Sequence, residues 1–287
     1  MMTVIALAVV AAIGWGAADF FGGDSAGRGM PVFTVVAVSE LLGVLTLVPA
    51  LAARPVPDLA DPRIALAAVA GVAVTVELSL IYSALGRGDS FATAPVSALG
   101  TAIAVTAGLL TGDRLTVLIA AGLACAVLGG GISTWASPAA AGGAAVARTV
   151  MTCLGASVSV AVMLACLHAA GQLDPYWATA VEHLSTALSA GLIATARTRR
   201  APRRGLPGSR QLAVLAVIAV AGAGGDLAYT AASRQGTLSI VSAVSSLYPL
   251  TTIALGRVLR GGRATRVQLA GAALAVAGTV VLGAAAH

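Results

Sequence analysis

The chain has 287 residues, of which 58% are hydrophobic and only 10% are charged. A water-soluble domain carries roughly 25% charged residues, so this composition excludes a soluble globular fold for most of the chain. The net charge is +6, from 17 basic and 11 acidic residues; every basic residue is arginine, and six arginines gather in the connection 197–210. A basic loop in so apolar a chain is typical of a membrane surface and does not indicate a nucleic-acid site.

Ten apolar stretches are long enough, or nearly so, to cross a hydrocarbon core, which needs roughly 20 helical residues. Because lipid offers no partners for open backbone groups, each of these spans must be helical. We place them at 4–22, 31–53, 64–86, 90–111, 115–135, 148–169, 177–196, 210–232, 238–259 and 265–285. The first lacks a basic start and a clear cleavage site, so we interpret it as a span and not a signal peptide. The sequence therefore predicts an all-α, multi-pass integral membrane protein.

The chain is self-similar over long stretches. Residues 82–129 resemble 229–278, with matching positions 147 to 149 residues apart. A small, flexible linker at 137–147 separates a first unit, 1–136, from a second unit, 148–287. Each unit holds five spans, and an odd number makes the second unit enter the membrane from the opposite side. We therefore expect ten transmembrane helices arranged as two inverted five-helix repeats.

Five acidic residues fall inside the predicted spans, namely Asp19, Glu40, Glu77, Glu182 and Asp226. A charge at the bilayer centre costs about 2.5–3.5 kcal/mol on insertion scales, so such residues face a cavity or a partner. One interpretation is a shared proton- or cation-binding site; the other is that some are hydrogen-bonded structural acids. Glu40 and Glu182 lie in the second span of each unit, 142 residues apart, and we take them as repeat mates.

Aromatic residues accompany these acids at helical spacing. Trp15 precedes Asp19 by four residues, and Tyr229 follows Asp226 by three, which places each pair on one helix face. We expect the cavity wall to include Trp15, Tyr82, Tyr229 and Tyr248. Pro95 and Pro249 lie inside spans; each could break its helix to line a cavity or simply kink it.

No motif for catalysis or metal binding stands out. The three cysteines all lie in apolar spans, and His168 and His183 are not at metal-ligand spacing with any of them. His183, beside Glu182, is a candidate for a proton relay. Neither a nucleophile elbow nor a His-Glu-x-x-His motif occurs in the chain. We expect no cofactor, no metal and no enzymatic activity.

Four segments, GWGAADFFGG (14–23), GDLAYTAASRQG (225–236), VSSLYPLTTI (244–253) and AGAALAVAGTVVLG (270–283), resemble the drug/metabolite transporter superfamily, EamA-type branch. The resemblance implies two inverted five-helix halves, a central cavity and alternating access without a nucleotide-binding domain. It also implies acids at the places of Asp19 and Asp226. The family's Gly-Glu-Arg turn is altered to Gly-Asp-Arg at 112–114 and to Gly-Gly-Arg at 261–263, where it lacks an acid.

From these features we expect a secondary active transporter that exports small metabolites or drugs across the plasma membrane, by proton coupling or by exchange. Its partners would be a small-molecule substrate, protons and the lipid bilayer, with no nucleic acid, as a monomer or homodimer. A membrane-embedded enzyme of lipid or isoprenoid metabolism and a non-transporting scaffold are the alternatives. Orientation is open, because the positive-inside rule places both termini outside the cytoplasm whereas the family places them inside.

Overall fold

A computed structural model of the protein describes residues 2–86, 116–134, 143–198, 207–260 and 265–284. The described residues fold into helices joined by short turns, without a strand. The helices are α1 (Met2–Gly27), α2 (Val32–Ala52), α3 (Pro62–Gly86), α5 (Val117–Thr134), α6 (Gly143–Gly171), α7 (Pro175–Thr198), α8 (Ser209–Ser233), α9 (Leu238–Ser245), α10 (Tyr248–Arg260) and α11 (Arg266–Ala284). The predicted span 90–111 with Pro95, both altered family turns and most of the linker 137–147 lie outside the described residues.

The all-helical, membrane-spanning prediction is confirmed for the described residues. Six segments are long and apolar enough to cross a membrane: α1, α2, α3, the second part of α6, α8 and the pair α9–α10. The helices α5, α7 and α11 stand where spans were predicted, but they do not reach that length and hydropathy over described residues. The count of ten spans is therefore not established over the described residues.

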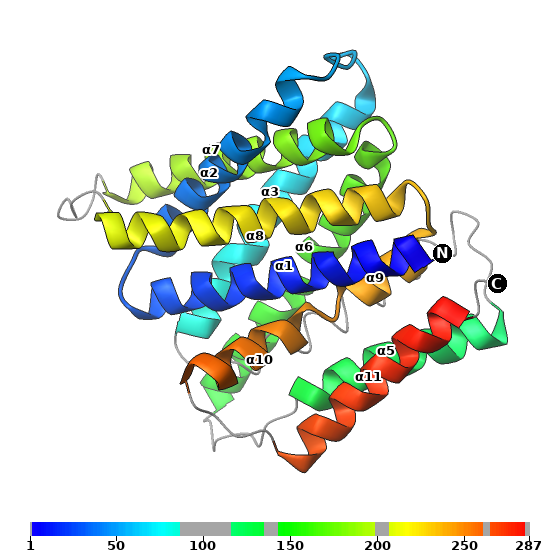
Figure 1. Ribbon diagram of the computed structural model, residues 1–287. Helices are drawn as coiled ribbons and strands as arrows, with labels where there is room; N and C mark the ends of the chain where they lie inside the picture. The colour runs from blue at the N-terminus through cyan, green and yellow to red at the C-terminus, as the bar shows by residue number, and fades with distance from the viewer. Residues whose placement is uncertain (1, 87–115, 135–142, 199–206, 261–264, 285–287) are drawn as a thin grey trace.

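The helix packing has the symmetry that two equivalent halves require. Between the halves, α1 packs against α8 as α6 packs against α3. Two further pairs, α2 with α7 and α5 with α11, join equivalent helices directly (Figure 1). Exchanging the two halves maps this set of contacts onto itself, which is the behaviour of a pseudo-two-fold axis passing between α2 and α7 and between α5 and α11.

Burial fixes how α2 and α7 correspond. Each of the six buried positions of α2 has a buried position of α7 143 residues further on: Val35, Val36, Ser39, Glu40, Gly43 and Leu47 against Ala178, Thr179, Glu182, His183, Thr186 and Ala190. The prediction that Glu40 and Glu182 are mates is therefore wrong, and the mate of Glu40 is His183. One residue turns a side chain by about 100° around a helix, so this shift changes which groups meet at the axis.

A similar shift applies to α3 and α8. Their buried faces match at 148 residues, with Ala67, Ala70, Gly71, Thr75, Ile81 and Ala84 against Leu215, Ile218, Ala219, Ala223, Tyr229 and Ala232. The similarity in sequence pairs Tyr82 with Tyr229, 147 apart, but by burial the mate of Tyr229 is Ile81. Both tyrosines nevertheless make equivalent contacts, because each hydroxyl donates to a carbonyl of the first helix of its own half, Ala18 for Tyr82 and Leu164 for Tyr229.

The predicted span 238–259 is interrupted. The helix α9 ends at Ser245 and α10 begins at Tyr248, with Pro249 in its first turn. Proline lacks the N–H that continues a helix, and it is tolerated in the first turn, where that N–H would have no partner. The break, and not a plain kink, is thus the outcome for Pro249, and it brings Ser246 and Tyr248 to the centre of the molecule.

Candidate functional site

A cavity of about 50 Å³ lies among α1, α2, α3, α6, α8 and the α9–α10 break. Its polar and aromatic wall consists of Trp15, Asp19, Glu40, Glu77, Tyr82, Asp226, Ser246 and Tyr248, and its apolar wall includes Val74, Val160 and Met163. Both halves contribute to this wall. By the same measure one water molecule needs roughly 10–15 Å³, so the cavity can hold water beside its carboxylates.

Four of the five predicted acids, Asp19, Glu40, Glu77 and Asp226, line this cavity, each no more than 7% exposed. They come from α1, α2, α3 and α8, and the cost of burying a carboxylate in lipid explains why all four face inward. None of the described residues donates a hydrogen bond to Asp19 or Glu77. The buried hydroxyl of Tyr248 likewise has no hydrogen-bond partner in the described part of the chain.

Asp226 differs from these acids because both of its carboxylate oxygens are engaged. Trp15 donates from Nε1 to Oδ1 at 2.8 Å, and His183 Nε2 lies 3.2 Å from Oδ2. Glycine at position 225 makes the first contact possible, since a Cβ there would lie 2.7 Å from Cδ1 of the Trp15 indole. Asp226 thus joins α1 of the first half to α7 of the second.

The aromatic residues divide into two groups. Trp15, Tyr82 and Tyr248 line the cavity as predicted, and the Trp15 and Tyr248 rings meet edge to face with centroids 6.4 Å apart. The prediction that Tyr229 lines the cavity is wrong. Its ring packs behind Trp15 at 5.4 Å, and its hydroxyl donates to the Leu164 carbonyl at 2.8 Å. The hydrogen bond to α6 and the contact with Trp15 hold the ring behind the cavity wall.

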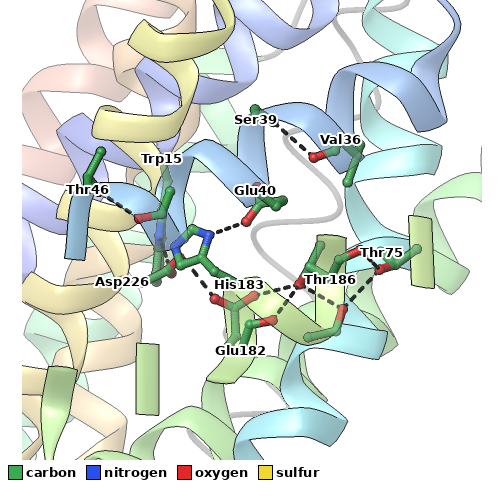
Figure 2. A network of polar contacts seen from close by, with 12 residues as sticks. Trp15, Val36, Ser39, Glu40, Thr46, Thr75, Glu182, His183, Thr186 and Asp226 are labelled. Carbon is green, nitrogen blue, oxygen red and sulfur yellow. Dashed lines mark hydrogen bonds and ion pairs between the residues drawn. The ribbon is translucent and has the colours of Figure 1, made fainter. Parts of the chain in front are cut away.

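His183 lies at the centre of a buried ion-pair network (Figure 2). Its Nδ1 pairs with Glu40, its Nε2 faces Asp226, and Glu182 Oε2 lies 3.7 Å from the same Nε2. The imidazole is only 1% exposed and does not itself line the cavity. The sequence indicated His183 only as a relay beside Glu182; the burial periodicity of α2 and α7 is the signal that would have placed it opposite Glu40.

Glu182 is fully buried and lies behind the cavity wall, unlike the other four acids. Thr186 donates to its Oε1 at 2.9 Å, which makes it partly a structural acid, as the alternative interpretation expected. Glu40, Glu182 and His183 present polar atoms within 4.8 Å of one another. Because both imidazole nitrogens already face carboxylates, we describe this group as an ion-pair network.

The charge balance of the site is strongly negative. The site holds five buried carboxylates and one buried imidazole, and no arginine lines the described part of the cavity. In a medium of low dielectric constant, several ionised carboxylates cannot coexist without protons or other cations to balance them. The site can therefore bind protons, a cationic solute, or both in turn.

Comparison with known proteins agrees with this architecture. A solved structure described as "Crystal structure of protein" superposes with a TM-score of 0.70 over 96% of this chain and 97% of its own, at 21% identity. That likeness shows the fold alone. No curated protein matches the chain. The model of the EamA-like transporter family matches twice, over residues 2–135 and 147–284. The chain therefore belongs to the EamA-like transporter family, within the drug/metabolite transporter superfamily, and is a multi-pass membrane protein of the transporter type.

Proposed function

We propose that the protein is a secondary active transporter that exports small cationic metabolites or drugs across the plasma membrane by alternating access. The observation that carries this proposal is the pair of buried carboxylates, Asp19 and Glu77, which lack donors among the described residues. A cation balances them, and the faces of Trp15, Tyr82 and Tyr248 attract an organic cation further. An anionic solute would meet only like charge in this cavity.

Alternating access is supported by ion pairs that connect the two halves at opposite ends. At one end Arg54, following α2, pairs with Asp174, preceding α7, at 2.9 Å. At the other end Asp24 of α1 pairs with Arg260 of α10 at 2.5 Å. Ion pairs that water reaches contribute only about 0–1 kcal/mol each, so either end can open at low cost.

Uptake into proteoliposomes tests the proposal. We would compare radiolabelled choline and spermidine with neutral leucine and anionic glutamate, in the wild type and in Asp19→Asn and Glu77→Gln. At an effective dielectric constant near 20, losing one negative charge about 5 Å from a bound cation costs about 3 kcal/mol, so each variant should lower the apparent affinity for the cations roughly tenfold or more. Asp58→Asn, an exposed loop acid, is the matched control and should behave as wild type.

Two results would contradict the proposal. Preference for glutamate or leucine over both cations would show that the carboxylates do not select the solute. Unchanged cation uptake in both Asp19→Asn and Glu77→Gln, with normal expression, would remove these residues from the binding site.

A further inference from the structure

We propose that His183 is a proton-binding site, held between Glu40 and Asp226, and that a cation in the cavity displaces its proton. The inference rests on the proposed function, because displacement becomes coupling only in a carrier. It assigns the histidine, which is not a cavity residue, to the exchange of a proton for the solute.

The chemistry of the imidazole ring supports this assignment. A neutral imidazole has one N–H donor and one acceptor nitrogen, whereas an imidazolium donates from both nitrogens. Both nitrogens of His183 face carboxylates, Glu40 at Nδ1 and Asp226 at Nε2. With both carboxylates ionised, only the imidazolium satisfies both contacts. Losing its proton would leave one nitrogen lone pair against a carboxylate oxygen.

The surroundings of His183 contain acids but no competing base. Glu40 on α2, Glu182 on α7 itself and Asp226 on α8 all approach the ring. On α3, the acid Glu77 lines the cavity and makes no ion pair with His183 among the described contacts. The remaining neighbour, α6, contains no acidic residue, and its ionisable side chains are Arg148 near its start, Cys153, Cys166 and His168. The proton on His183 is therefore balanced by carboxylates alone.

The network also connects the proton on His183 to the cavity and makes that proton compete with a bound cation. Asp226 and Glu40 both line the cavity, so each connects the buried imidazole to cavity water. A proton leaving Nε2 passes to Oδ2 of Asp226 and then to water, which leaves neutral imidazole and, again, an ionised Asp226. An imidazolium repels a cation about 6 Å away. At an effective dielectric constant near 20, this repulsion weakens the binding of the cation about a hundredfold.

The repeat makes this arrangement specific to the second half. By the buried faces of the helices, the mates of His183 and Asp226 are Glu40 and Leu78. A glutamate and a leucine cannot form an ion pair, so the two halves, which exchange conformations in alternating access, differ in how well they hold a proton.

The test is nuclear magnetic resonance of the full-length protein in nanodiscs, with isotope-labelled histidine. The chain has only three histidines, so His183→Gln and His168→Gln assign the signals. We expect His183 to carry protons on both nitrogens at pH 7, and saturating choline to reduce that imidazolium signal about tenfold or more. Choline has no ammonium proton of its own, so its arrival cannot protonate the site. His168, which has no acid on its helix, is the internal control and should not respond.

A transport measurement separates coupling from a structural role. His183→Gln should lose about tenfold more of the choline accumulation driven by a pH gradient than of the choline exchange across vesicles at equal pH. His168→Gln should keep both. A purely structural histidine would lower both activities together, and that result would overturn the proposal.

Other outcomes are equally decisive. A His183 ring with a single N–H from pH 5 to pH 9 would overturn the proposal, even if His183→Gln fails to fold. So would a change in the ring signal on adding EDTA, which would show that a metal ion occupies the network. If no cation is transported by the wild type, the proposed function fails, but the titration of His183 without choline still decides whether it binds a proton.

Discussion

Replacing Gly43 by alanine should disturb the His183 network from α2, without altering any polar group. A Cβ on Gly43 would lie 2.9 Å from Nδ1 of His183 and 3.1 Å from its Cε1. Ordinary contact needs about 3.5 Å, so the ring must recede by roughly 0.6 Å. Because Glu40 and Asp226 hold the ring on its two nitrogens, it cannot recede without stretching an ion pair.

The expected loss of stability follows from two opposing effects. Removing one partner of a buried ion pair costs about 3–5 kcal/mol, because the other charge is left uncompensated. Alanine recovers about 1 kcal/mol of helix propensity relative to glycine. If the contact with Glu40 is lost, Gly43→Ala should lower the free energy of unfolding by about 2–4 kcal/mol.

Reversible unfolding in mixed micelles measures this change, with Gly224→Ala as the matched control. No atom lies within 4 Å of a Cβ built on Gly224, also in a helix, so that variant should gain about 0.4–1 kcal/mol. In a His183→Ala background the steric conflict is gone, and Gly43→Ala should then be neutral or stabilising. If Gly43→Ala is as stable as Gly224→Ala in the wild-type background, the packing argument is wrong.

Three further changes probe other contacts. Trp15→Phe keeps an aromatic ring but removes the Nε1 donor to Asp226. The affinity for the cation, measured in a binding titration, should fall roughly tenfold. An unchanged affinity would exclude a role for this hydrogen bond in binding. Arg54→Ala breaks the half-exposed pair with Asp174 and the contact of Arg54 with the Tyr176 ring, but it leaves the hydrogen bonds by which Asp174 caps α7. The unfolding free energy should therefore fall by less than about 2 kcal/mol, while a cysteine introduced at that end becomes more accessible to thiol reagents. A larger loss of stability would contradict a weak contact that opens easily. Hydrogen bonds from Arg63 and its charge lower the pKa of Asp61 to about 2. The contribution of Asp61 to stability is therefore present above about pH 4 and lost as the pH falls towards 2. In a plot of unfolding free energy against pH, Asp61→Asn should reduce the slope between about pH 4 and 2 and leave the slope elsewhere unchanged.

The inward position of the acids was predictable because it depends on energy and not on helix rotation. A carboxylate in a span is costly wherever it meets lipid, so Asp19, Glu77 and Asp226 had to face the interior. The two-fold repeat was predictable for a similar reason, since similar sequences fold alike. Which helices meet across the axis, and where a span breaks, depends on packing that a single sequence does not display.

The position of His183 was missed because two ways of aligning α2 with α7 give different registers. One matches identical residues in the sequence, and the other matches the buried faces of the helices. Pairing Glu40 with Glu182 aligns identical residues, but it would align lipid-facing Leu41 with buried His183. The pattern of exposed leucines, with Leu41 matching Leu184, selects the other register. For apolar helices, the periodicity of exposed residues is therefore a better guide to repeat mates than identity at one polar position.

The symmetric scaffold itself requires some of the asymmetry that the site displays. On the pseudo-two-fold axis a residue faces its own mate, so a perfect repeat would place Glu40 against a second carboxylate. At 4 Å and an effective dielectric constant near 20, two like charges cost about 4 kcal/mol. A histidine at 183 turns that repulsion into an ion pair and lets α2 and α7 pack closely. Away from the axis, Glu77 has Gly225 as its mate, and the space left by that glycine admits Trp15 to Asp226. The two halves thus have the same helix arrangement but different charged groups. They differ where an identical repeat would have placed one acid against another or filled the cavity with a second side chain.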